Sequence, residues 1–494
     1  MDGGADRTAR RRARAVAETL ARRLGGGCVL TDPEALRPYE CDGLSAYRAL
    51  PAAVVLPRSR EEVREVVRAC AEAGVPLVPR GAGTSLSGGA VPHPEGIVLS
   101  LARMNRVLEV DVRNRVARVE PGVRNLAVTE AAAPYGLYYA PDPSSQVTCT
   151  IGGNVAENAG GVHCLKYGLT VHNVVGVEMV TVEGEFVRLG GVAPDAPGYD
   201  LLALLIGSEG MLGVVTEATV RLLPRPVCAR VLLAAFDDIP TAGEAVSRII
   251  AAGIIPGGLE MMDGPAIRAA EDFVHAGYPV DAAAILLCEL DGTPEEVEED
   301  IGRVRAILED CGAREVRLAR DERERALFWS GRKNAFPAVG RISPDYYCMD
   351  GTIPRRALAR VLEGIARLSE AYGLAVVNVF HAGDGNLHPL ILYDANRPGE
   401  LERTEELGLR ILELCVEAGG TITGEHGVGL EKLPAMCVQF TREEIAQFHA
   451  VKEAFDPGRI LNPDKAIPTL ARCAELGGMH VRGGRLPFPD LERF

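Results

Sequence analysis

The 494-residue sequence lacks any paired cysteine motif. Its 12 cysteines are scattered, and no two of them are spaced as Cys-x-x-Cys. Iron–sulfur clusters and cysteine-rich zinc sites usually need such pairs, so we expect neither within this chain. A long chain with unpatterned cysteines is typical of a reduced, intracellular protein rather than of a disulfide scaffold.

Long apolar runs and an excess of positive charge are also missing. No apolar run approaches the ~20 residues that span a bilayer, so we expect membrane contact only indirectly, through a partner. The net charge of −15 argues against nucleic acid as a partner, although a few converging cations could still bind a small anion. The Arg-rich start has no apolar centre and contains Asp2, Asp6 and Glu18, so we expect a cytoplasmic protein without a targeting segment.

The length and the element pattern predict two or three packed domains. A helix is expected behind a capping box formed by Ser59 and Glu62, and a second capping box, Thr293 with Glu296, predicts another. Short β-like runs alternate with Gly-rich loops up to a boundary near residues 223–226, and mixed strands and helices follow. We therefore expect an α+β protein with four parts: an N-terminal helical segment (1–50), a first domain (51–228), a second, α/β domain (229–467) and a tail (468–494).

Three Gly-rich loops lie in the first domain, at residues 80–85, 141–161 and 207–213. Adjacent glycines let backbone N–H groups converge on an anion, and three such loops exceed what turns require. Leu86 stands where G-x-G-x-x-G needs its third glycine, so the nicotinamide-type Rossmann motif is absent, and no Walker A sequence occurs. The loops predict a cradle for a long phosphorylated ligand.

Two short polar stretches hold three of the nine histidines: HAGDGNLH (381–388) and GEHG (424–427). A lone histidine is more often structural, but His381, His388 and Glu425 together form a plausible first shell for a divalent metal. Zinc, manganese and iron all suit such ligands.

Arg332 lies beside the only tryptophan of the chain and could clamp a carboxylate. A surface helix charge explains it equally well. For Asp350 and Arg355, an acidic turn before a helix start is an adequate explanation.

The sequence resembles the FAD-linked oxidases, which have a flavin domain of the vanillyl-alcohol-oxidase (PCMH) type and a C-terminal cap. RGAGTSLSGG, the 142–168 segment and GSEGMLG look like the family's flavin-binding segments, and HAGDGNLHP, GEHGVG and FDPGRILNP look like its C-terminal motifs. Within the family, ECDGLSAY, GLEMMD and LPFPDLERF are similar to the flavin subunits of bacterial glycolate oxidases. The resemblance runs from about residue 40 to residue 494.

The resemblance implies FAD as cofactor, with a two-part FAD-binding domain (51–228), a C-terminal cap (229–467) and a C-terminal helical segment. The residues implied to hold FAD are Arg80, Gly81, Ala82, Gly83, Thr84, Ser85, Asp142, Ser145, Gly152, Gly153, Asn158, Gly160, Gly161, Glu209, Gly213, Val214 and Asn462. The same resemblance implies His381, His388 and Glu425 as metal ligands, His426 as catalytic base and Arg332 as the contact for the substrate carboxylate.

We therefore expect an FAD-dependent oxidoreductase that converts a small 2-hydroxy acid, such as glycolate, to the 2-oxo acid. Leu390 replaces an asparagine that contacts substrate in relatives acting on 2-hydroxyglutarate, which favours a smaller substrate. The resemblance also implies companion subunits, one of them an iron–sulfur protein, and a position at the inner membrane only through them. The alternatives are a D-lactate dehydrogenase of the same family, a non-catalytic flavin scaffold for electron transfer and, less well supported, a metal-dependent hydrolase.

Overall fold

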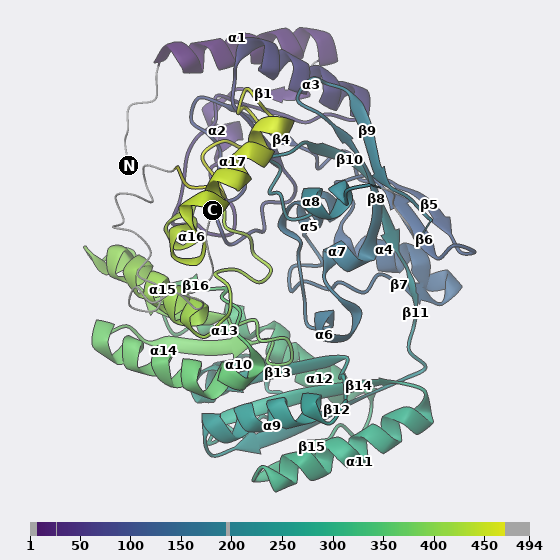
Figure 1. Cartoon of the computed structure of the whole chain (residues 1–494), viewed down its shortest axis with the longest axis vertical. Coiled ribbons are helices and arrows are strands. Elements are labelled where there is room, and N and C mark those ends of the chain that lie inside the picture. Colours follow the sequence, from purple (N-terminus) through teal and green to yellow (C-terminus); the bar gives the residue numbers. More distant parts are fainter. Residues whose placement is uncertain (1–6, 26, 194–197, 470–494) are drawn as a thin grey trace.

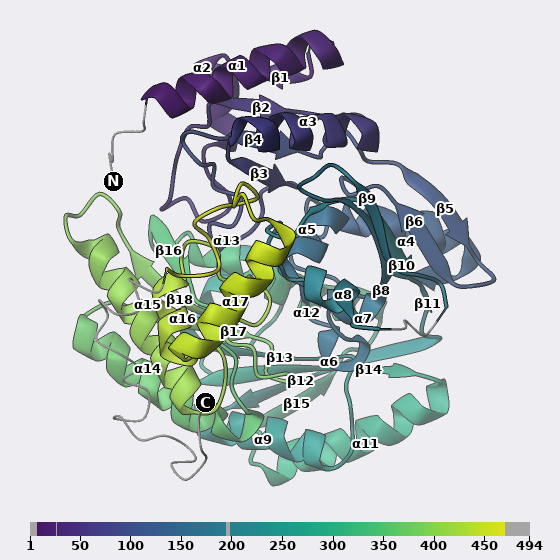
Figure 2. The same cartoon turned by 45° about the horizontal axis from the view of Figure 1, so that its top comes forward.

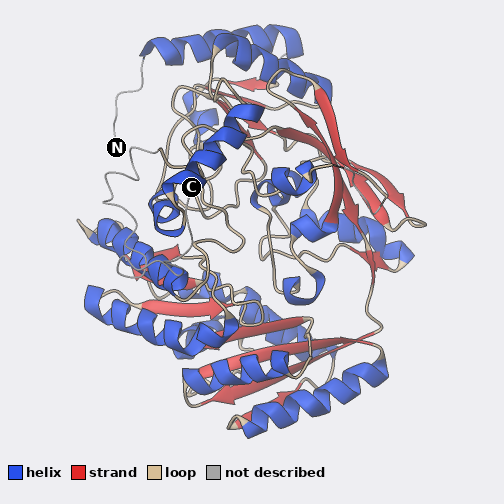
Figure 3. Cartoon of the chain, in the orientation of Figure 1, coloured by secondary structure: helices blue, strands red, loops and turns tan. Residues whose placement is uncertain are grey.

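The computed structural model describes residues 7–25, 27–193 and 198–469, and the predicted tail beyond residue 469 lies outside them. It has two lobes, an N-terminal lobe with a four- and a five-stranded sheet and a C-terminal lobe with a seven-stranded sheet. Figures 1 and 2 show the N-terminal lobe above the C-terminal lobe, and Figure 3 shows helices and strands mixed in both. The expected α+β class is confirmed.

The four-stranded sheet is covered by the first long helices of the chain. Its strand order is β1-β2-β4-β3. β2, β4 and β3 are parallel to one another, and the edge strand β1 is antiparallel to β2. Ala13, Ala17 and Leu20 of α1 and the Val63–Cys70 face of α3 are buried in the same apolar cluster as this sheet. The elements of this part are α1 (Arg7–Leu24), β1 (Val29–Leu30), α2 (Pro33–Leu36), β2 (Ala53–Val55), α3 (Arg60–Ala73), β3 (Leu77–Arg80) and β4 (Ile97–Ser100).

The five-stranded sheet is antiparallel, in the order β5-β6-β10-β8-β9. Alternate residues of β10 point into an apolar cluster that also takes Ile151 and Val155 of α5. The Gly-rich segment 141–161 contains α5, and the Gly-rich loop 207–213 leads from α8 into β10. The elements of this part are β5 (Val107–Asp111), β6 (Val116–Val119), α4 (Asn125–Ala132), β7 (Leu137–Tyr138), α5 (Ile151–Glu157), α6 (Cys164–Tyr167), α7 (Thr170–Asn173), β8 (Val174–Val180), β9 (Phe186–Gly190), α8 (Leu201–Leu205), β10 (Val214–Arg221) and β11 (Leu223–Pro224).

The seven-stranded sheet of the C-terminal lobe has the order β15-β12-β14-β13-β17-β18-β16 and is buried on both faces. Along β12, Leu232 and Ala234 pack under α9, α11, α14 and α15, whereas Leu233 and Ala235 pack under α10, α12 and α13. Leu44 and Met211 of the N-terminal lobe belong to the first cluster and Val162 to the second, so both clusters reach that lobe. The elements are β12 (Cys228–Phe236), α9 (Ile239–Ala251), β13 (Gly258–Asp263), α10 (Gly264–Val274), β14 (Ala284–Gly292), α11 (Pro294–Asp310), β15 (Glu315–Leu318), α12 (Glu322–Lys333), α13 (Ala335–Val339), β16 (Asp345–Cys348), α14 (Leu358–Tyr372), β17 (Val376–Phe380), β18 (Pro389–Tyr393) and α15 (Glu400–Glu417).

The end of the described chain returns to the N-terminal lobe through α16 (Leu433–Gln439) and α17 (Arg442–Phe455). Beyond α17 the chain pairs with β3, because Leu77 donates to the Ile460 carbonyl at 2.7 Å and Asn462 donates to the Leu77 carbonyl at 2.8 Å. Lys452 fixes this return by donating to the Leu461 carbonyl and to Asp456.

Helix capping agrees with the sequence in one of two places. Thr293 and Glu296 form the predicted capping box at α11. Ser59 caps α3 by accepting from Glu62 N, but the Glu62 carboxylate accepts from Arg58 N instead of Ser59 N, so the reciprocal half of that box is shifted by one residue. None of the described helices is both long and apolar enough to cross a membrane.

A buried ionic cluster joins the two lobes at His163. Its Nδ1 lies 2.8 Å from Asp142 Oδ2 in the N-terminal lobe, and its Nε2 lies 3.3 Å from Glu289 Oε1 on β14. Glu289 also accepts from Arg325 and Trp329 of α12. Burial lowers the pKa of His163, but the carboxylates of Asp142 and Glu289 outweigh burial and raise the pKa to about 10. His163 is therefore a cation that holds α12 against the N-terminal lobe.

Replacing His163 by glutamine should remove a pH dependence of stability. The pKa of about 10 in the folded protein exceeds the ordinary value of 6.5, so its stabilisation is complete below about pH 6.5 and is lost as the pH rises through 10. Urea unfolding between pH 7 and 10 should show wild-type stability falling by a few kcal/mol (~1.4 per pKa unit) and His163→Gln staying flatter. His172→Gln, in the same lobe, is the control. Parallel pH profiles of wild type and His163→Gln would contradict the assignment.

Candidate functional site

One cavity between the lobes is lined by the three Gly-rich loops and by the polar residues of the C-terminal lobe. The residues predicted from the sequence that line it are Arg80, Gly81, Ala82, Gly83, Thr84, Ser85, Ser145, Gly152, Gly153, Glu209, Gly213, Val214, Arg332, His381, His388, Glu425 and His426. Segments separated by more than 300 positions therefore meet at one site.

The glycines of the cavity wall allow close approach of backbone. A Cβ on Gly152 would lie 2.7 Å from Pro121 Cβ, so no larger residue fits where the chain turns into α5. Gly83 has φ +71°, in the left-handed region that favours glycine. Arg80 is buried, and its Nη1 donates to the Cys41 carbonyl at 2.8 Å and the Ala90 carbonyl at 3.2 Å. Its charge thus braces the loop, and backbone N–H groups with Thr84 and Ser85 face the cavity.

Five residues predicted to touch the cofactor lie behind the wall of the cavity. Asp142 pairs with His163, and Gly161 packs against Asp142. Asn158 ends α5 in the left-handed region and accepts from Val171 N. Gly160 packs against Glu425, and a Cβ added to Gly160 would lie 3.2 Å from Glu425 Cβ. Asn462 donates to the Glu209 and Gly89 carbonyls.

His381, His388 and Glu425 converge as the sequence predicted. His381 Nε2 lies 3.2 Å and His388 Nε2 lies 3.0 Å from Glu425 Oε1, and the potential ligand atoms lie within 4.8 Å of one another. His381 Nδ1 bonds to Glu260 Oε1 at 2.8 Å, and His388 Nδ1 bonds to the Met349 carbonyl at 3.3 Å. With both Nδ1–H groups donated outward, both Nε2 lone pairs face the same carboxylate oxygen.

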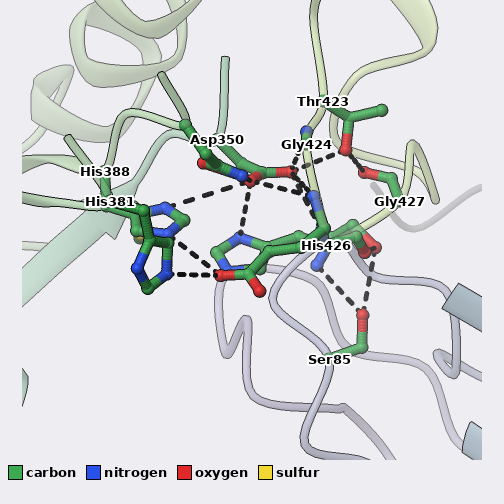
Figure 4. A network of polar contacts seen from close by, with 12 residues as sticks. Ser85, Asp350, His381, His388, Thr423, Gly424, His426 and Gly427 are labelled. Atoms are coloured by element: carbon green, nitrogen blue, oxygen red, sulfur yellow. Dashed lines mark hydrogen bonds and ion pairs between the residues drawn. The ribbon is translucent and has the colours of Figure 1, made fainter. Parts of the chain in front are cut away.

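Asp350 organises the loop that carries Glu425 and His426, a role that its sequence context did not reveal. The carboxylate is fully buried, and its Oδ2 accepts from Thr423 Oγ1 at 2.6 Å, Gly424 N at 3.0 Å and His426 N at 2.9 Å. Its Oδ1 accepts from the side chain of Asn386 at 3.1 Å. Figure 4 shows these bonds radiating from Asp350. One carboxylate thus fixes both histidine-bearing stretches.

Glu260 is a second functional residue missed by sequence reasoning. It is 1% exposed, and while Oε1 bonds to His381, Oε2 lies 2.7 Å from Arg332 Nη2. Arg332 is also 1% exposed, and its Nε has no hydrogen-bond partner in the described structure. The alternative that Arg332 is a surface charge is therefore wrong. Its guanidinium lines the cavity with donor capacity left for an anion.

His426 stacks on His388, with ring centroids 4.9 Å apart and an interplanar angle of 12°. Burial lowers its pKa to about 4, and its Nδ1 has no hydrogen-bond partner among the described residues. The loop is held from the other lobe as well, because Glu209 accepts from Val428 N at 2.7 Å and Gly429 N at 2.8 Å.

Leu390 does not line the cavity. It is fully buried in β18, where it pairs with Cys348 and Val377. Phe336 of α13 lines the cavity instead and packs edge-on against His388, with ring centroids 6.2 Å apart. The apolar wall beside the histidines is therefore provided by a residue that the sequence did not single out.

Comparison with known proteins places this cavity in a family. The model of an FAD binding domain matches residues 51–190, and the model of the C-terminal domain of FAD linked oxidases matches residues 225–466. The chain belongs to the FAD-linked oxidases. It is an FAD-dependent oxidoreductase, and its relatives are both glycolate oxidase subunits and D-lactate dehydrogenases.

The glycolate oxidase subunit GlcD of Escherichia coli is 66% identical over 94% of this chain and 93% of that protein. GlcD of Bacillus subtilis is 43% identical over 88% of this chain and 93% of its own length. A D-lactate dehydrogenase of Archaeoglobus fulgidus is 35% identical over 90% of this chain and 97% of its own length. Among solved structures, p-cresol methylhydroxylase shares the fold, with a TM-score of 0.78 at 18% identity over 95% of this chain and 98% of that one.

Asp350→Asn should destabilise the protein, because an amide nitrogen would face N–H groups that now donate to a carboxylate. We expect the free energy of unfolding to fall by about 2–4 kcal/mol. The matched control is Asp384→Asn in the neighbouring loop. Asp384 accepts from Asn386 N at 3.3 Å, a bond that an amide oxygen can also accept, so we expect a loss under about 1 kcal/mol. Equal losses in denaturant unfolding of the two variants would refute the role of Asp350.

Proposed function

We propose that this protein is the flavin subunit of a glycolate oxidase and oxidises glycolate to glyoxylate. The proposal rests on one observation: the Gly-rich loops line the same cavity as Arg332, His381, His388, Glu425 and His426. A site that combines a buried arginine with donor capacity left beside Glu260, a cation-binding cluster and a neutral imidazole suits a small hydroxy acid.

The cavity fits FAD along its N-terminal wall. The loop of residues 80–85 offers backbone N–H groups and two hydroxyls, which suit the pyrophosphate. Gly152 and Gly153 leave the wall beside α5 free of side chains, and Gly213 and Val214 line the opposite side. We propose that these residues hold FAD directly, while Asp142, Asn158, Gly160, Gly161 and Asn462 hold the loops in place. When bound, FAD supplies the acceptor for the hydride that leaves the substrate Cα.

The cluster of His381, His388 and Glu425 fits a divalent metal. Two imidazole lone pairs and a carboxylate oxygen within 3.2 Å repel one another unless a cation lies between them. Without a metal, a proton on His381 must take the place of the cation. Burial lowers the pKa of His381, but Glu260 and Glu425 outweigh burial and raise the pKa well above its usual range. Glu260 is the carboxylate partner that commonly orients a metal-bound histidine. We propose zinc, manganese or iron here, which would polarise the substrate hydroxyl.

Arg332 and His426 would act on the substrate itself. The guanidinium of Arg332 would bind the carboxylate, and Glu260 keeps that guanidinium in place. Because the pKa of His426 is lowered to about 4 by burial, its imidazole is neutral at pH 7 and can accept the hydroxyl proton. The stack on His388 holds the imidazole beside the metal cluster.

Companion subunits follow from the name of the relatives, which are subunits of a larger oxidase. We propose that an iron–sulfur partner takes the electrons onward, since this sequence has no Cys-x-x-Cys motif of its own. In that assembly the chain would work on the cytoplasmic side, reaching the inner membrane only through its partners.

D-lactate oxidation is the second candidate, because relatives 33% and 35% identical are D-lactate dehydrogenases. The extra methyl group is worth only ~1–3 kcal/mol in an apolar pocket. Phe336 beside His388 favours the smaller acid.

When the purified flavoprotein is mixed anaerobically with each acid, glycolate should bleach the flavin faster than D-lactate does, and L-lactate should be least effective.

His426→Ala should retain FAD yet slow bleaching by at least about 100-fold, because the hydroxyl proton loses its acceptor. His449→Ala, on the surface helix α17, is the control. A loss under about tenfold in His426→Ala would refute the base, and a flavin that no 2-hydroxy acid bleaches would support the scaffold alternative.

Removal of the metal ligands gives an independent test. His388→Ala and Glu425→Gln should lower the divalent metal content of the purified protein, measured by elemental analysis, from about one equivalent to under about 0.2. His172→Ala is the control and should keep its metal. An active wild-type protein free of bound divalent ions would refute the site.

A further inference from the structure

A second cavity lies next to the functional site, and we call it the vestibule. It is lined by residues 43–46, Leu86, residues 344–346, Cys348 and Tyr393, and its volume is about 190 Å³. These residues come from the segment before β2, from a Gly-rich loop of the N-terminal lobe and from the edge of the seven-stranded sheet. Like the functional site, the vestibule is therefore formed between the lobes.

The vestibule has an exposed outer wall and an inner wall that lies beside the histidine cluster. Gly43, Ser45 and Pro344 on its outer wall are exposed, whereas Cys348 on its inner wall is only 4% exposed. Cys348 Sγ lies within 4.8 Å of the nearest ring nitrogens of His388 and His426. The inner end of the vestibule therefore adjoins the stacked imidazoles.

Two apolar side chains separate the vestibule from the functional site. Leu86 lines both cavities. Phe336 lines the functional site, and its ring packs between His388 of the site and Tyr346 of the vestibule, with centroid distances of 6.2 Å to each. Leu86 follows directly on the 80–85 loop, whose Ser85 carbonyl accepts from Gly43 N at 2.8 Å. The partition is thus tied to the wall of the vestibule.

We propose that the vestibule is the entrance for the substrate and that Leu86 and Phe336 limit the size of the acid that passes. This inference rests on the proposed oxidation of a 2-hydroxy acid. Among the described lining residues Asp345 alone is charged, and its Oδ2 accepts from Ala395 N at 2.9 Å. A passage of this volume with hydroxyl and phenol groups admits a two- to four-carbon hydroxy acid and excludes a nucleotide or a peptide.

An entrance affects the rates of binding but not its equilibrium. Stopped-flow measurement of the flavin spectrum with oxalate, a non-reacting two-carbon acid, gives both rate constants. In Ser45→Trp, at a residue that lines the vestibule and not the functional site, association and dissociation should both slow by at least about fivefold, while the dissociation constant changes by less than about twofold. Leu86→Ala should instead raise kcat/KM for 2-hydroxybutyrate relative to glycolate by at least about fivefold.

Leu108→Trp, on the edge strand β5 at a residue 36% exposed, is the matched control and should change neither rate constant. The entrance is refuted if Ser45→Trp leaves the association rate of oxalate unchanged, or if Leu86→Ala changes kcat/KM for every acid by the same factor. FAD content and thermal unfolding identify a variant that has lost its fold, and Leu86→Ala then decides alone. If wild type neither binds oxalate nor oxidises a hydroxy acid, the proposed function is at fault rather than the entrance.

Discussion

The site depends on buried carboxylates that accept hydrogen bonds from the loop of residues 423–429, and Asp350 holds the first part of that loop. Its carboxylate accepts from the backbone of Gly424 and His426 and from the side chains of Thr423 and Asn386. A loop with that many N–H groups directed at one point can exist in a dry interior only around an anion. Asp350 therefore determines where Glu425 and His426 lie.

The two lobes hold the same loop from opposite sides. The resemblance implied Glu209 as a cofactor contact. Its carboxylate accepts hydrogen bonds from Val428 N and Gly429 N, just after His426. Glu260 links Arg332 to His381, so the proposed carboxylate contact and a proposed metal ligand share one anchor. A substitution at any of these carboxylates would therefore disturb binding and chemistry together, because the groups act as one network.

In the proposed function, this acidic protein would bind an anionic substrate through one buried arginine that lines the cavity. Arg332 is 1% exposed, and in such a low-dielectric setting one guanidinium attracts a carboxylate far more strongly than a surface arginine does. Phe336 and Leu86 provide apolar bulk next to the polar cluster, which in the proposed function would favour a small acid, and Asp345 is the one charged residue among the described residues that line the vestibule.

The sequence by itself determined the α+β class, the Gly-rich loops, the histidine cluster and the flavin family, because these depend on local patterns and on long motifs. The helix that begins at Thr293 and Glu296 was also readable, because capping is a local interaction. Only the tertiary structure decided the roles of Glu260, Asp350, Phe336 and Leu86, whose partners lie 36 to more than 120 positions away or in the other lobe. The residues next to them in the sequence do not indicate those contacts. The sequence pattern of an exposed acidic turn is therefore the same as that of a buried carboxylate with distant partners.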